Sequence, residues 1–139
     1  MPNVCPALTR RAAATAVLAL GLLAPGIVLA APTSVEIVAF AHPPVVQALQ
    51  PLRTWLSTQG TQVKAVETDM ESPAGAQRLQ ALGIKDHVPL VIVVNGSYRH
   101  KRSDGSPVEL VGFPSTSGST KGWTLDEAKD IITRAGTRR

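Results

Sequence analysis

The sequence is poor in cysteine and in aromatic side chains. Its 139 residues contain one cysteine, Cys5, and 4% aromatic residues. A single cysteine allows no intramolecular disulfide, no CxxC redox pair and no multi-cysteine metal site. The length allows one domain at most. Because 44% of the residues are hydrophobic and 17% are charged, the composition favours a folded chain whose core is mainly aliphatic.

The short motifs of common catalytic and nucleotide-binding sites are also missing. The sequence has no G-x-S-x-G, no H-E-x-x-H, no P-loop and no G-x-G-x-x-G. Glu67, Asp69 and Glu71 lie close together, but they follow a predicted strand into a polar turn, so a solvated rim is the simpler interpretation. The sequence therefore assigns no catalytic residue and no cofactor, and an enzyme of unrecognised type stays an alternative.

The first thirty residues have the pattern of a secretory signal peptide. Arg10 and Arg11 precede an uncharged run over residues 12–24, a Pro-Gly break follows, and small residues lead to Ala30. A basic region, a short apolar region and an A-x-A-like site are typical of a cleaved signal. We therefore expect cleavage of residues 1–30, export to the periplasm or the medium, and no stable membrane anchor afterwards.

Two alternatives stay open for this segment. The uncharged stretch from residue 12 to residue 31 is 20 residues long, and about 20 apolar residues can span a membrane as an uncleaved anchor. Thr9-Arg10-Arg11 also resembles a twin-arginine export signal. Cleavage would remove the only cysteine and two of the 14 basic residues, leaving 12 basic against 10 acidic residues.

The region that follows begins with a predicted strand, helix and strand. The near-continuous apolar run over residues 35–40 indicates a buried strand, and residues 62–66 indicate a weaker one. Between them, Pro51 removes one backbone hydrogen bond from the predicted helix and should kink it. The apolar face of that helix has five residues at helical spacing: Val45, Val46, Leu49, Leu52 and Leu56.

A second helix and the strongest strand come next. Ser72-Pro73 is typical of a helix start, and Gly83 of a helix end. The predicted apolar face of this helix consists of Ala76, Leu79 and Leu82. Residues 90–94 form the strongest predicted strand, and Asn95-Gly96 after it is typical of a two-residue hairpin turn.

The last part of the chain predicts one more strand and one more helix. The strand covers residues 108–113, and the Ser/Thr/Gly-rich residues 114–122 indicate a loop. Thr124 and Glu127 form a capping box at the start of the helix, and Gly136 is expected to end it. The resulting order is β-α-β-α-β-β-α, for which a mixed sheet with helices on both faces is the simplest packing.

This order resembles the thioredoxin-like superfamily. Pro51 lies where thioredoxins carry a kink proline, and residues 83–89 resemble the stretch that leads to their cis-proline, with one extra residue. Residues 90–96 resemble the strand and turn that follow, and residues 111–113 resemble the end of the last strand. The resemblance covers residues 35–135 and implies an α/β three-layer fold.

The resemblance implies one thioredoxin-like domain over residues 31–139, with a folded core over residues 34–136. It also implies that the Val88–Pro89 bond is cis, a state found in about 5–6% of X–Pro bonds. The redox-active members carry CxxC at the first turn of the first helix. Pro43 and Val46 stand there in this chain, or His42 and Val45 after a one-residue shift. Neither pair supplies a thiolate, so thiol–disulfide exchange is excluded.

In thioredoxin-like proteins, the groove beside the cis-proline pairs with extended polypeptide. The resemblance therefore implies a thiol-free binding or structural module that pairs with a polypeptide partner by strand addition. The corresponding groove residues in this chain are His42, Pro43, Pro44, Val45, Val88 and Pro89.

A metal-binding protein is the alternative hypothesis. If the resemblance holds, the loops that carry His42 and His87 are neighbours. Two imidazoles could bind copper or zinc there, with Asp86 or Asp69 as a further ligand. The copper-binding members of the superfamily also use cysteines, which this region lacks.

The basic quartet Arg99-His100-Lys101-Arg102 and the indole of Trp123 are candidates for surface interactions. The quartet could contact an acidic polymer, or it could be a solvated hairpin. Nucleic acid is not an expected partner, because the chain is predicted to be exported and stacking aromatics do not alternate with the charges. Trp123 could bind a partner, or it could staple the last helix by packing on Ala128.

Overall fold

The computed structural model describes residues 31–116 and 122–137. The predicted signal peptide, residues 1–30, lies outside the described residues, as do residues 117–121 of the predicted loop and the last two residues. No helix in the described ranges is long and apolar enough to cross a membrane.

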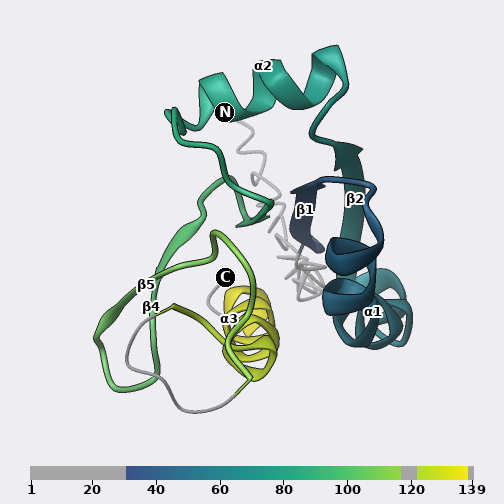
Figure 1. The fold of residues 1–139 in the computed structure, drawn as a ribbon. Helices are drawn as coiled ribbons and strands as arrows, with labels where there is room; N and C mark the ends of the chain where they lie inside the picture. Colours follow the sequence, from purple (N-terminus) through teal and green to yellow (C-terminus); the bar gives the residue numbers. More distant parts are fainter. Residues whose placement is uncertain (1–30, 117–121, 138–139) are drawn as a thin grey trace, which may run out of the picture.

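The described residues form three α-helices and five strands (Figure 1). They follow the predicted order, except that one further strand, Arg99–Lys101, forms a hairpin with Pro107–Glu109. They are β1 (Thr33–Ala39), α1 (Pro43–Ser57), β2 (Val63–Asp69), α2 (Pro73–Ala81), β3 (Leu90–Val94), β4 (Arg99–Lys101), β5 (Pro107–Glu109) and α3 (Leu125–Thr137). The main sheet has the order β2-β1-β3, in which β1 is parallel to β2 and antiparallel to β3. The predicted mixed sheet in an α/β fold is therefore confirmed.

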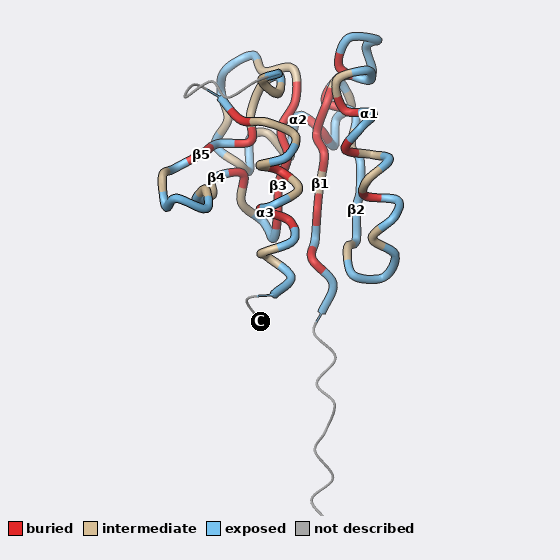
Figure 2. Tube along the Cα trace, turned by 90° about the horizontal axis from the view of Figure 1, so that it is seen from below, coloured by how far each residue is buried: buried red, intermediate tan, exposed pale blue. Residues whose placement is uncertain are grey.

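Helices cover both faces of this sheet. Because side chains alternate along a strand, β1 and β3 each contribute to two separate apolar clusters. The larger cluster joins α1 and α3 to Val35, Ile37, Ala39, Leu90, Ile92 and Val94. The smaller cluster joins Leu79 and Leu82 of α2 to Val38, Val91 and Val93. Figure 2 shows β1 as a largely buried central strand, whereas β2 is a largely exposed edge.

The local turn and cap signals are confirmed. Asn95 and Gly96 both have positive φ, 50° and 85°, as a type I′ turn requires. At the start of α2, the side-chain oxygen of Ser72 accepts a hydrogen bond from the backbone N–H of Gly75 at 3.1 Å. At its end, Gly83 has a φ of 72°, and the Ile84 N–H donates to the carbonyl of Leu79 at 3.0 Å. These bonds pair backbone groups that a helix end would otherwise leave free.

The expected apolar helix faces need two corrections. Val46 of α1 is 36% exposed, and Ala76 of α2 is also exposed. The buried face of α1 turns toward Val45, Leu49, Leu52 and Leu56 only. In α2 the buried position is Gly75, because the helix approaches the end of β2 too closely for a side chain.

Two backbone expectations also differ from the structure. No peptide bond in the described residues is cis, so the expected cis Val88–Pro89 bond is wrong. The trans form is the intrinsically favoured one, and with it the Pro89 carbonyl accepts a hydrogen bond from the Phe40 N–H at 3.1 Å. The predicted strand over residues 108–113 is divided, because β5 pairs with β4 while Val111 bridges to Val91 of β3. Helix α3 includes Gly136 and does not end before it.

Candidate functional site

A groove lies at the carboxyl end of β1, next to the start of α1. Its volume is about 390 Å³, and it is lined by Phe40, His42, Pro44, Val45, Glu71, His87, Pro89 and Phe113. Helix α1, which follows β1, packs on one face of the sheet, and helix α2, which follows β2, packs on the other face. In open α/β sheets, binding clefts form at the carboxyl ends of two adjacent strands whose following helices lie on opposite faces of the sheet.

The two histidines that the sequence pairs do lie in this one groove. The ring of Phe40 contacts both, with centroid distances of 5.4 Å to His42 and 5.4 Å to His87. The ring planes of Phe40 and His42 form an angle of 75°, which is an edge-to-face contact. Both histidine side chains are exposed, so the three rings form an accessible aromatic wall.

Glu71 adds a carboxylate to the groove. The His42 Nε2 and the Glu71 Oε2 are 3.0 Å apart, and the two side chains are 59% and 57% exposed. The backbone N–H of Glu71 donates to Oδ1 of Asp69 at 3.0 Å, which fixes the turn before α2. The sequence predicted that Glu71 is a solvated surface residue, and its side chain is exposed. The sequence did not predict its hydrogen bond with His42.

The metal hypothesis lacks a complete ligand set. Among the described residues, no group of three or more His, Cys, Asp or Glu side chains could hold a metal ion. His42 and His87 each contact the ring of Phe40, and His42 is already hydrogen-bonded to Glu71. Zinc sites in proteins use three or four protein ligands, so the geometry does not favour the proposed use of Asp86 or Asp69.

Backbone groups beside the groove have no partner. The side chain of Val88 packs against the smaller core cluster. In the part of the chain that the structure describes, neither the N–H nor the carbonyl of Val88 makes a hydrogen bond. Of the expected groove residues, Pro43 is exposed but does not line the cavity. Val88 does not line it either, but lines a separate hollow of about 330 Å³ that also includes Glu109.

Phe40 and Phe113 complete the groove, although the sequence interpretation had not selected them. Phe113 is 50% exposed, so its ring is accessible from the groove that it lines. The signal that could have found Phe40 is its position directly after the buried strand. Phe113 follows Gly112, whose φ of 80° turns the chain after the bridge to β3.

Arg102 of the basic quartet is an internal clamp. Its Nε donates to Glu127 Oε1 at 2.6 Å, and its two terminal nitrogens donate to the carbonyls of Pro107 and Gly122, each at 2.6 Å. The guanidinium thus joins the β4–β5 hairpin to the start of α3. The expectation that Arg102 serves a surface interaction does not fit this geometry.

The rest of the quartet is a solvated hairpin with local partners. Arg99 pairs with Glu109 at 2.7 Å and stacks over the ring of Tyr98 at 4.6 Å. Lys101 is exposed, and His100 Nε2 lies 2.8 Å from the Ser97 carbonyl. Burial lowers the pKa of His100, although the Ser97 hydrogen bond acts in the opposite direction.

Trp123 is a core residue. It is fully buried in the same cluster as Ala128, and its Nε1 donates to the carbonyls of Val111 and Gly112 at 3.1 and 3.2 Å. Its expected role as a surface-binding aromatic is therefore wrong. Trp123 and Ala128 lie in the same core cluster, which agrees with the alternative prediction that Trp123 packs on Ala128 at the start of α3.

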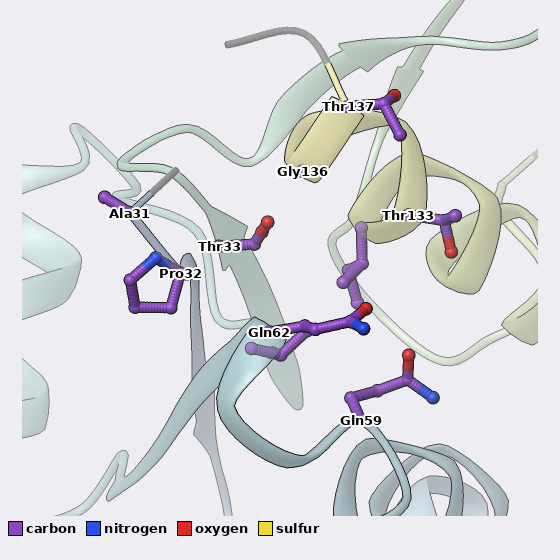
Figure 3. Close-up of a pocket in the computed structure, with 10 residues that line it drawn as sticks. Ala31, Pro32, Thr33, Gln59, Gln62, Thr133, Gly136 and Thr137 are labelled. Carbon is purple, nitrogen blue, oxygen red and sulfur yellow. The ribbon is translucent and has the colours of Figure 1, made fainter. Parts of the chain in front are cut away.

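A second hollow, of about 240 Å³, lies at the opposite end of β1, where β1 meets α3 (Figure 3). Its polar lining consists of hydroxyl and amide side chains: Thr33, Gln59, Gln62, Thr133 and Thr137. Because the described residues of its lining include no titratable side chain, they supply no acid, base or charged group to this hollow. The groove at the carboxyl end of β1 is the better candidate site.

Comparisons with protein-family models, with curated proteins and with solved structures found no match to this chain. The function has to be argued from the groove itself.

Proposed function

We propose that this chain is an exported, thiol-free thioredoxin-like domain that binds an extended polypeptide in the groove beside Pro89. The order β2-β1-β3, with helices on both faces, is compatible with such a domain. The observation that carries the proposal is the unpaired backbone of Val88 beside an accessible apolar cavity.

An extended peptide would match both parts of this surface. Its backbone N–H and carbonyl groups would pair with those of Val88, as in strand addition. Side chains of a strand point alternately to opposite sides, so one side chain would enter the groove while its neighbours face away. A cavity of about 390 Å³ lies within the range of about 300–1,000 Å³ that is typical of ligand sites.

The groove suits binding better than covalent catalysis. Among the residues that the structure describes, its lining includes no serine, threonine, cysteine or lysine that could act as a nucleophile. Five of its eight lining residues, Phe40, Pro44, Val45, Pro89 and Phe113, are apolar. Apolar walls with a few polar groups are typical of recognition sites.

The first test changes Phe113, because its exposed ring can be removed without opening the core. The probe is a capped nonapeptide of alternating valine and threonine with a central leucine. We expect Phe113→Ser to weaken its binding at least about fivefold, since burial of a large apolar side chain contributes about 1.5–3 kcal/mol. Isothermal titration calorimetry measures the affinity, and thermal melting shows whether stability changes.

Val66→Ser is the matched control. Val66 is 49% exposed and lies on the edge strand β2, outside the groove. This variant should bind the nonapeptide like the parent. A second peptide, methylated on its central backbone nitrogen, should bind more weakly than the parent peptide. Equal affinities for both peptides, or for both variants, would overturn the proposal.

A further inference from the structure

Glu71 differs from every other glutamate of the chain in its side-chain partner. The sequence contains five glutamates, and the structure describes all of them. Four of them pair with an arginine at 2.6–2.7 Å: Glu36 with Arg78, Glu67 with Arg53, Glu109 with Arg99, and Glu127 with Arg102. Glu71 is the fifth, and it pairs with His42.

The described residues offer no arginine to Glu71. All five arginines in the described ranges already pair with a carboxylate, the fifth being Arg134 with Asp130. The described residues that line the groove include neither arginine nor lysine. Glu71 is therefore the one groove residue with a fixed charge, and that charge is negative.

The surroundings of Glu71 suit a planar cation. Its Oε2 faces His42, whereas its Oε1 has no hydrogen-bond partner within the described part of the chain. Phe40 and Phe113 line the same groove, and Phe113 is half exposed. A guanidinium can donate to a carboxylate and stack on an aromatic face at the same time, which an ammonium does less well.

We propose that the polypeptide bound in the groove carries an arginine, whose guanidinium pairs with Glu71 and lies against the rings of Phe40 and Phe113. This inference rests on the proposed function, because it names the side chain that the bound strand places in the groove. Charge complementarity favours an arginine in the groove, because the other four glutamates each pair with an arginine of the chain.

The test compares three forms of the capped valine–threonine nonapeptide, with arginine, citrulline or leucine at the centre. Citrulline has nearly the shape of arginine but no charge. We expect the arginine peptide to bind about fivefold tighter than the citrulline peptide, because charge-assisted hydrogen bonds are stronger than neutral ones while partial exposure reduces the gain. In Glu71→Gln this ratio should fall to about one.

Glu67→Gln is the control, because Glu67 is an exposed glutamate of β2 that pairs with Arg53 and does not line the groove. It should keep the preference for arginine. Equal binding of the three peptides to the parent protein would overturn the arginine inference and leave strand binding intact. Binding of none of them would overturn both proposals, and a preference that survives in Glu71→Gln would overturn the role of Glu71.

Discussion

Gly75 allows α2 to begin against the end of β2. A Cβ at this position would lie 2.7 Å from the Cα of Met70 and would also collide with the carbonyl oxygen of Asp69. Both obstacles are backbone atoms, which cannot turn aside as a flexible side chain can. The turn that holds Glu71 in the groove therefore depends on the absence of a side chain at Gly75.

Gly75→Ala should lower the free energy of unfolding by about 1–3 kcal/mol, as overpacking does. Alanine would otherwise stabilise a helix by about 1 kcal/mol. The control is Ala76→Gly at the next, exposed position of α2, which should cost about 1 kcal/mol or less. Urea unfolding measures both changes. A Gly75→Ala variant more stable than the parent would contradict this packing.

Single residues of the groove were only partly predictable from the sequence. His42, Pro44, Val45, His87 and Pro89 were predicted, because they flank elements that the sequence itself delimits. Phe40, Glu71 and Phe113 were not, since they come from three separate segments and meet only in the folded chain. Trp123 shows the reverse error, because an aromatic ring in a polar segment proved to be buried.

At the scale of elements, the start of α3 depends on a shared carboxylate. Glu127 Oε2 accepts the backbone N–H of Thr124 at 2.7 Å, and Glu127 Oε1 accepts Nε of Arg102 at 2.6 Å. Burial alone would raise the pKa of Glu127, but the bonds from Arg102 and Thr124 outweigh it and lower that pKa below its usual value. The ionised form is therefore favoured in the folded state.

Glu127→Gln should reduce the free energy of unfolding by about 1–2 kcal/mol at pH 7, where the stabilising carboxylate is charged. Because the folded pKa is lowered, the contribution is complete above the unfolded pKa of about 4.3 and is lost as pH falls through the folded pKa. The difference from the parent should therefore shrink in acid. Asp126→Asn is the control, because the side chain of Asp126 is 93% exposed. A difference that does not depend on pH would contradict this account.

Elements whose signals are local were predicted more accurately than those set by long-range packing. The Asn95-Gly96 turn, the Ser72 cap and the capping box of α3 each depend on neighbouring backbone groups. The faces of α1 and α2 depend on how closely each helix approaches the sheet, which periodicity alone does not give. The expected cis bond before Pro89 came from the resemblance, and local chemistry did not require it.

At the scale of the whole molecule, the two hollows lie at opposite ends of β1. The seven residues of β1 extend over about 20 Å at about 3.3 Å per residue. Residues 31 and 32 line the hollow at the amino end, whereas the groove begins at Phe40. A cut before residue 31 would therefore leave the groove intact.

The predicted leader has a direct test in the mass of the protein purified after expression of the full chain. We expect a chain that begins at Ala31, because the small-residue site precedes it. The expected location is a soluble fraction outside the cytoplasm. An intact chain that begins at Met1 and sediments with membranes would contradict cleavage and favour the anchor.

The central claim is that an extended peptide binds along Val88 with an arginine in the groove. Its most direct test is a map of backbone amide chemical shifts of the processed protein as the central-arginine nonapeptide is added. We predict the largest changes at Phe40, His87, Val88 and Phe113, with little change at Thr33. Changes confined to the amino-end hollow or to the β4–β5 hairpin would contradict the claim.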